Sequence, residues 1–213
     1  MLALEKIIYS QDISFILVVV SFLIISLIKG MYWKHAKLFF MGVFAQRYAN
    51  QYLREENAFT ERVNLLTFLL MAINFTLLIT KFQATIDLFI IVSVFSLVAL
   101  FFLLKIILIA LLGFLFKVRD IARLTVFFSL LFDKTLGFIL FPLVVVMYFF
   151  TFEISSIVLF VSLVFFIILL MLKLFWFWQI GMNSFGLSRV YIFLYLCIIE
   201  IFPLLLLAKG FFY

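Results

Sequence analysis

Six long stretches of apolar residues run along the chain, and shorter segments that carry most of the charged residues separate them. A bilayer core of roughly 30 Å is crossed by a helix of about 20 apolar residues, within a range of about 17–25. The pattern therefore predicts six membrane-spanning helices in a single membrane domain that covers residues 1–213. The predicted spans are 13–28, 63–80, 86–104, 135–152, 154–172 and 190–208.

The third span lies inside a longer apolar run that extends from Ala84 to Phe116. Asp87 and Lys105 mark its ends, because a helix between these two charges is roughly 27 Å long, close to one hydrocarbon thickness. The remaining residues, 106–116, are too few to cross the membrane again. They are predicted to continue as a helix along the interface or just beyond it.

Lysine and arginine residues gather on alternate connections between the predicted spans. The first, third and fifth connections carry six, five and two of them, whereas both tails and the second connection carry one each and the fourth carries none. Basic residues accumulate on the cytoplasmic side of a membrane. This distribution predicts six spans with both termini outside the cytoplasm.

The spans form three consecutive hairpins, each consisting of a helix, a cytoplasmic segment and a second helix. Each first span closes with a similar motif that ends in lysine. These motifs are SLIK at 26–29, FLLK at 102–105 and LMLK at 170–173. Two interpretations stay open, namely an internal repeat of the kind found in transport folds and chance similarity between apolar sequences.

The first cytoplasmic segment, residues 31–54, has the periodicity of an amphipathic helix. Such a helix, with a basic face, lies in the membrane interface among anionic headgroups, and residues 117–134 have a similar pattern. The sequence thus predicts one or two interfacial helices. The apolar positions of the first are Trp33, Ala36, Phe40, Val43 and Phe44. The basic residues beside them are Lys34, Lys37, Arg47 and Arg54.

Composition supports the membrane class and narrows the chemistry. Apolar residues make up 69% of the chain and charged residues 12%, against roughly 45–50% and about 25% in soluble domains. A single cysteine excludes an internal disulfide, and with a single histidine it excludes Cys-rich and multi-His metal sites, so no metal or cofactor is predicted. Membrane topology accounts for the net charge of +6, so no nucleic-acid partner is predicted.

Glu200 is the most conspicuous single residue, because it lies near the middle of the last predicted span. A charge at that depth costs at least about 2.5 kcal/mol, so the side chain is protonated, paired or turned toward a polar cavity. It is either a coupling carboxylate or partner contact, or a protonated group bonded to a neighbouring helix. Cys197 precedes it by one turn, and Pro203 frees a backbone carbonyl nearby. The candidate partners of Glu200 are Asn74, Tyr191 and Tyr195.

A second group of polar residues precedes the second span. It is either a solvated cytoplasmic patch or the headgroup site of a lipid-modifying enzyme, and Glu61 and Arg62 are predicted to cap the entry of the span. His35 is predicted to lie at headgroup level. The sequence carries no nucleotide-binding loop and no recognised catalytic constellation, which disfavours an enzyme. The candidate cytoplasmic cluster comprises Arg47, Arg54, Glu55, Glu56 and Arg62.

The C-terminal segment YIFLYLCIIEIFPLLLLAK, residues 191–209, resembles the ending of small inner-membrane proteins from Bacteroidota that are known only as a domain of unknown function. The segments RVNLLTFLLMAINF (62–75) and FDKTLGFILFPL (132–143) also look like that family. The resemblance implies a location in the bacterial inner membrane but no activity. The residues of the tail pattern are Leu194, Tyr195, Leu196, Cys197, Glu200 and Pro203.

Three functions remain open. The first is a non-catalytic subunit or scaffold of a cell-envelope complex, which has other membrane proteins or further copies of itself as partners. The second is a small transporter or lipid-handling protein that uses Glu200 as a buried coupling carboxylate. The third is a lipid-modifying enzyme that uses the cytoplasmic cluster. Membrane lipids are expected partners in every case, and the fold is predicted to be an all-α bundle.

Overall fold

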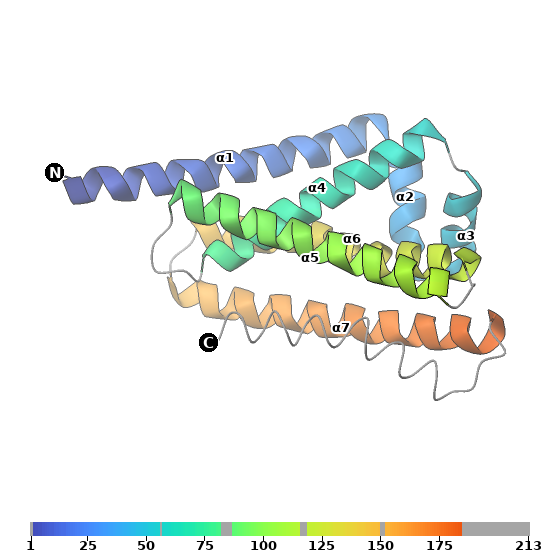
Figure 1. Ribbon diagram of the computed structural model, residues 1–213. Coiled ribbons are helices and arrows are strands. Elements are labelled where there is room, and N and C mark those ends of the chain that lie inside the picture. Colours follow the sequence, from blue (N-terminus) through green and yellow to red (C-terminus); the bar gives the residue numbers. More distant parts are fainter. Residues whose placement is uncertain (1, 56, 82–86, 116–118, 150–151, 185–213) are drawn as a thin grey trace. The chain divides into compact units, whose positions relative to one another are not determined.

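The computed structural model describes residues 2–55, 57–81, 87–115, 119–149 and 152–184 (Figure 1). Within these ranges the chain forms helices and turns and contains no strand. The all-α prediction is therefore confirmed for the described residues. The helices are α1 (Leu2–Met31), α2 (Trp33–Met41), α3 (Gln46–Arg54), α4 (Ala58–Thr80), α5 (Leu88–Leu115), α6 (Arg119–Phe149) and α7 (Phe152–Ser184).

Four of these helices are long and apolar enough to cross a membrane. They contain the first two predicted spans and cover most of the third and fourth, at 88–104 and 135–149. Helix α7 contains the fifth, with a shorter apolar stretch at Phe160–Trp176. The sixth predicted span, 190–208, lies outside the described residues. The arrangement of six spans in three hairpins stays a prediction. The four candidate spans are Asp12–Met31, Ala58–Thr80, Leu88–Leu111 and Arg123–Phe149.

Contacts between residues divide the chain into two units. The first unit comprises residues 1–99 and 131–166, and the second comprises residues 100–130 and 167–213. Helices α5, α6 and α7 each contribute residues to both units.

In the first unit, α1 packs along α4, and α2 packs against α1, α3 and α4. Figure 1 shows that α2 runs crosswise to α1 and α4. A continuous apolar core joins α1, α2 and α4 to α6. Burial of apolar side chains is the main favourable contribution to this packing. The buried residues of this core are Val18, Ile24, Ile28, Tyr32, Ala36, Val63, Leu70, Ile73, Leu77 and Val144.

Helices α4 and α6 approach each other closely at Gly137. A β-carbon added there would lie 2.6 Å from Met71 Cα and 2.7 Å from Met71 Cβ. Only glycine fits at this position, and small residues have the same use at many helix crossings in membranes. Pro142 lies inside α6 one turn further on without ending the helix.

The segment 31–54 is amphipathic, but the prediction of a single helix is wrong. The chain turns at residues 42–45 and forms two short helices, α2 and α3. Gly42 permits this fold, because a β-carbon there would meet Phe39 O at 3.0 Å and Ala49 Cβ at 3.2 Å. The predicted apolar face is also partly wrong, since Ala36 and Val43 are buried whereas Trp33 and Phe44 are exposed.

The segment 117–134 is not a separate interfacial helix over the residues that the structure describes. From Arg119 it belongs to the continuous helix α6, which includes the fourth candidate span. Helix α5 continues past Lys105 to Leu115, which agrees with the prediction that the residues after Lys105 continue as a helix. For α6, the hydropathy pattern placed the start of the span after Lys134, a charged residue that the structure accommodates inside the helix.

In the second unit, Phe128 stacks on Trp176 with ring centroids 6.4 Å apart and an angle of 18° between the rings. Lys105 and Lys173, two of the lysines that close the repeated motifs, are buried, and both interact with other groups of the chain. Lys29, the third of these lysines, is exposed. The motifs are thus alike in sequence, but their lysines differ in environment.

Candidate functional site in the first unit

The centre of the first unit holds a polar side chain, Asn74, whose amide group both accepts and donates a hydrogen bond. Asn74 is fully buried in α4. Its Oδ1 accepts a hydrogen bond from Ser21 Oγ of α1 at 3.2 Å, and its Nδ2 donates to the Gly137 carbonyl of α6 at 2.9 Å. One amide therefore links three helices, and each bond of this kind inside a membrane contributes about 0.6 kcal/mol.

Most hydroxyl groups of α4 donate hydrogen bonds to backbone carbonyls of the same helix. Thr67, Thr76 and Thr80 each donate to the carbonyl four residues earlier, at 2.7 to 2.9 Å. At the end of the helix, the Tyr148 hydroxyl of α6 donates to the Leu77 carbonyl at 3.0 Å and lies 3.2 Å from Thr80 Oγ1. These hydroxyls help α4 to sit in an apolar environment without unpaired polar groups.

Lys134 of α6 is the charged residue of the site, and its side chain is almost fully buried. Its Nζ donates to the Asn64 carbonyl at 3.1 Å and also to Asn64 Oδ1. The same ammonium lies 5.9 Å from the ring centroid of Phe39 and 5.8 Å from that of Phe68. Two oxygen acceptors and two aromatic faces thus surround it, all of which favour a positive charge.

Beside the first turns of α4, His35 of α2 approaches the acidic end of α3. His35 Nδ1 lies 3.6 Å from Glu55 Oε2, a distance that makes an ion pair when the imidazole is protonated. Gln51 Nε2 donates to the other carboxylate oxygen of Glu55 at 3.1 Å. The His35 ring also stacks on Phe59 of α4, with centroids 5.8 Å apart and an angle of 1° between the planes. This group of contacts joins α2, α3 and α4.

The start of α4 is capped by Asn57 and Thr60, and not by Glu61 and Arg62 as predicted. The Asn57 side chain accepts from the Phe59 and Thr60 amides, and Thr60 Oγ1 accepts from the Asn57 amide, which completes a capping box. Arg62 instead contacts the Tyr32 hydroxyl of the α1–α2 junction at 3.4 Å.

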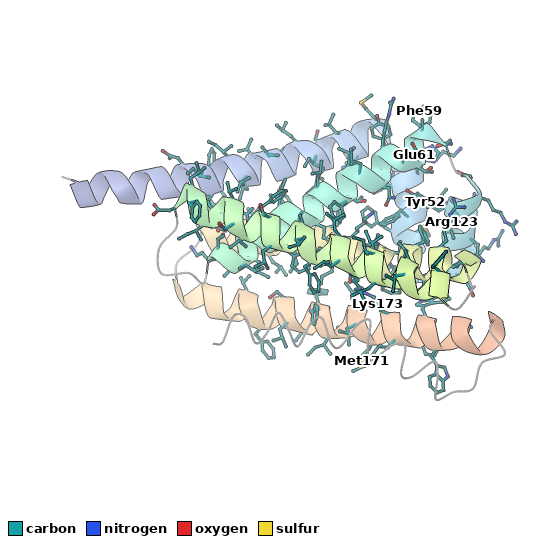
Figure 2. The ribbon with its side chains drawn as sticks, viewed as in Figure 1. Tyr52, Phe59, Glu61, Arg123, Met171 and Lys173 are labelled. Atoms are coloured by element: carbon teal, nitrogen blue, oxygen red, sulfur yellow. The ribbon has the colours of Figure 1, made fainter. Side chains whose placement is uncertain are left out.

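Tyr52 connects this cap to α3. Its buried hydroxyl donates to the Thr60 carbonyl at 2.8 Å, and its ring makes an edge-to-face contact with Phe39. Burial raises the pKa of the Tyr52 phenol, so the donor proton is retained. Figure 2 labels Tyr52 on α3 and Phe59 and Glu61 in the first turns of α4.

Replacement of Tyr52 by phenylalanine is expected to loosen the junction of α3 with α4 while the fold is kept. The ring and its contact with Phe39 remain, but the hydrogen bond to the Thr60 carbonyl is lost, at a cost of about 0.5–1.5 kcal/mol. Amide hydrogen exchange in the first turn of α4 should accelerate. Tyr48→Phe, the same change at a half-buried position of α3, is the control and should have no such effect.

Of the predicted intramembrane residues, Asn74 lies in the described part of the chain. Its observed partners are Ser21 and Gly137. Cys197, Glu200 and Pro203 lie outside the described residues, as do Tyr191 and Tyr195.

The structure links two members of the predicted cytoplasmic cluster, Glu55 and Arg62, through neighbouring side chains. Glu55 contacts His35 and Gln51, and Arg62 contacts Tyr32. Phe59 packs against both His35 and Tyr32, with centroids 5.8 and 6.2 Å apart. Arg47 and Arg54 are exposed on α3, and Glu56 lies outside the described residues.

Sequence reasoning missed three residues of the site, namely Ser21, Lys134 and Tyr52. Lys134 precedes the predicted fourth span by one residue, so the hydropathy pattern places it in the third connection, on the cytoplasmic side. The signal for Lys134 in the sequence is that a charged residue lies directly between two apolar runs of one long helix. Ser21 and Tyr52 carry no such signal, because serine and tyrosine are common in apolar helices and at interfaces.

In the described ranges, no group of three or more His, Cys, Asp or Glu side chains is placed to hold a metal ion. Over the described residues, the fold and the site thus define an all-α protein with four helices able to cross a membrane, in which polar side chains connect helices of the first unit. A family model described as a domain of unknown function, DUF4271, matches residues 14–211, and the chain belongs to this family. No curated protein and no solved structure matches the chain.

Proposed function

We propose that the protein is a non-catalytic multi-pass protein of the bacterial inner membrane that serves as a subunit or scaffold of a cell-envelope complex. The observation that supports this proposal is the use of the central polar group. Both sides of the Asn74 amide are engaged by other helices of the same chain. An amide held in this way fastens helices together and is not available to a passing substrate.

The surroundings of Lys134 support the same proposal. A lysine that moves protons or ions must change partners during its cycle. The Lys134 ammonium instead has two acceptors on Asn64 and two aromatic faces around it. A first unit whose buried polar groups are paired within the chain suits a protein that presents its surfaces to other proteins.

The exposed surfaces of the first unit are large and apolar. On α1 they include Phe15, Phe22 and Leu23, each more than half exposed. In a membrane these side chains contact lipid or the helices of another protein. The proposal includes six spans with both termini periplasmic in a cell of the Bacteroidota, supported by the distribution of basic residues and by the resemblance of the C-terminal tail.

Native mass spectrometry of the tagged full-length protein, purified from its own membranes in mild detergent, tests this proposal. We expect a second membrane protein at a fixed stoichiometry. We also expect Glu200→Gln to leave both the complex and the rescue of a deletion strain unchanged, because a scaffold needs no coupling carboxylate. Asp12→Asn, which removes an exposed carboxylate at the other end of the chain, is the control.

Two results would contradict the scaffold proposal. One is a chain that purifies alone or only with lipid. The other is an intact complex in which Glu200→Gln abolishes rescue, since that result separates assembly from an activity of the carboxylate and favours proton-coupled transport.

A further inference from the structure

The junction of α1 and α2 carries an exposed group of basic and aromatic side chains. Lys29, Lys34 and Lys37 are exposed, and Trp33 between them is 48% exposed. Met31 beside it is 69% exposed. We call the surface of Lys29, Trp33, Lys34 and Lys37 the basic collar.

The backbone places Trp33, Lys34 and Lys37 of the basic collar on the outer side of α2, and Lys29 at the end of α1. The chain bends at Tyr32, and α2 then runs crosswise to α1 and α4 (Figure 1). The opposite side of α2 is fixed by burial of Ala36 and Phe39. Because α1 and α4 are candidate spans, α2 lies near the plane of the membrane interface when they cross the bilayer.

Packing holds α2 in this orientation. Phe40 lies against Phe138 of α6 with ring centroids 4.6 Å apart. On the other side, Gly42 lies against Ala49 of α3, too close for a larger side chain. The collar is therefore presented by a helix whose position is set before any ligand binds, which lowers the ordering cost of binding.

We infer that the basic collar binds the headgroups of anionic phospholipids in the surrounding leaflet. Charge complementarity identifies the ligand, because three exposed lysines lie within nine residues at the junction of α1 and α2, while Glu55, the acidic group at the end of α3, is turned to His35 and Gln51. Trp33 adds an indole ring, which prefers the headgroup level of a bilayer. Lysines near an anionic leaflet together give a preference of roughly tenfold or more over a zwitterionic one. This inference does not depend on the identity of a protein partner.

Quenching of Trp33 fluorescence in nanodiscs tests the inference. The variant Trp176→Phe/Trp178→Phe leaves Trp33 as the single tryptophan of the chain. Brominated phosphatidylglycerol and brominated phosphatidylcholine are compared at equal mole fraction in a phosphatidylcholine bilayer. We expect stronger quenching by the brominated phosphatidylglycerol, and we expect high salt to remove most of the difference.

The decisive comparison uses two double variants. Lys34→Gln/Lys37→Gln should abolish the preference, whereas Lys34→Arg/Lys37→Arg retains both charges and should preserve it. Lys29 stays in both variants, so the positive charge at the end of α1 is kept. Equal quenching by both lipids in the parent protein would overturn the inference, and so would a preference that survives the glutamine changes. Quenching by neither lipid, as expected for a collar covered by an acidic protein surface, would also overturn it.

Trp176 is buried against Phe128, so its replacement removes a packing contact of the second unit. A second measurement therefore uses the parent tryptophans. Native mass spectrometry counts phosphatidylglycerol retained by the protein from mixed micelles with phosphatidylcholine. Loss of retained phosphatidylglycerol in the glutamine variant, but not in the arginine variant, is expected, and equal retention in both would contradict the collar as the binding site.

Discussion

Replacing Gly137 with alanine is expected to destabilise the protein, although alanine is the better helix former. The new β-carbon would lie 2.6 Å from Met71 Cα, which belongs to the backbone of α4 and cannot turn aside. Overpacking of this kind costs about 1–3 kcal/mol, whereas the gain in helix propensity is about 0.8–1 kcal/mol. The separation of α4 and α6 also stretches the hydrogen bond from Asn74 to the Gly137 carbonyl. Gly137→Val adds two further methyl groups and should cost more.

Unfolding by sodium dodecyl sulfate in mixed micelles, followed by circular dichroism, measures this effect. Gly30→Ala is the matched control, because a β-carbon at Gly30 meets nothing within 4 Å. It should leave the unfolding free energy unchanged or raise it by up to about 1 kcal/mol. An increase in stability for Gly137→Ala similar to that for Gly30→Ala would show that α4 and α6 do not approach closely at this point.

The positions of the described spans could be predicted because hydropathy and helix length are local properties of the chain. The predicted span 63–80 and helix α4 end at the same residue, Thr80. The start was missed by five residues, since the first turn is polar and the helix begins at Ala58 behind the Asn57 cap. A capping box can be seen in a sequence, but a hydropathy pattern does not register it.

The internal arrangement of the segment 31–54 could not be predicted in the same way. Helical periodicity placed Trp33 and Phe44 on the apolar face, but both are exposed. The turn at residues 42–45 ends α2, so Phe44 lies in the turn and does not continue the apolar face of that helix. At this turn Gly42 lies close to Ala49 of α3, a contact between two helices that helical periodicity does not predict.

The residues of the candidate site also differ in whether the sequence alone could point to them. The sequence singles out Asn74 as a candidate partner of Glu200, which lies outside the described residues, so that pairing stays a prediction. The observed partners of Asn74 could not be predicted, because Ser21 and Gly137 lie 53 and 63 residues away and are brought near only by packing. Glu200 attracts attention because it lies near the middle of the last predicted span, and its role stays a prediction.

Reversing the charge of Lys134 is expected to be the most damaging single change in the first unit. Every group around the ammonium favours a cation, since Asn64 offers two oxygen acceptors and Phe39 and Phe68 offer ring faces. A glutamate there would meet acceptors instead of donors, beside the acidic residue Asp133. A buried charge without a partner costs about 3–5 kcal/mol, so Lys134→Glu should fail to fold or lose most of its stability.

Lys134→Met separates the effect of charge from the effect of shape, because methionine fills similar volume without a charge. A buried ion replaced by an apolar side chain often changes stability little, so its unfolding free energy should fall by less than about 1.5 kcal/mol. Lys34→Glu, a reversal at an exposed position of α2, should change it by less than about 0.5 kcal/mol. These free energies are compared by the same unfolding titration.

If Lys134→Glu were as stable as Lys134→Met, the surroundings of Lys134 would not select a positive charge. If Lys134→Met kept its stability but failed to rescue a deletion strain, the ammonium would serve the function of the protein and not only its fold.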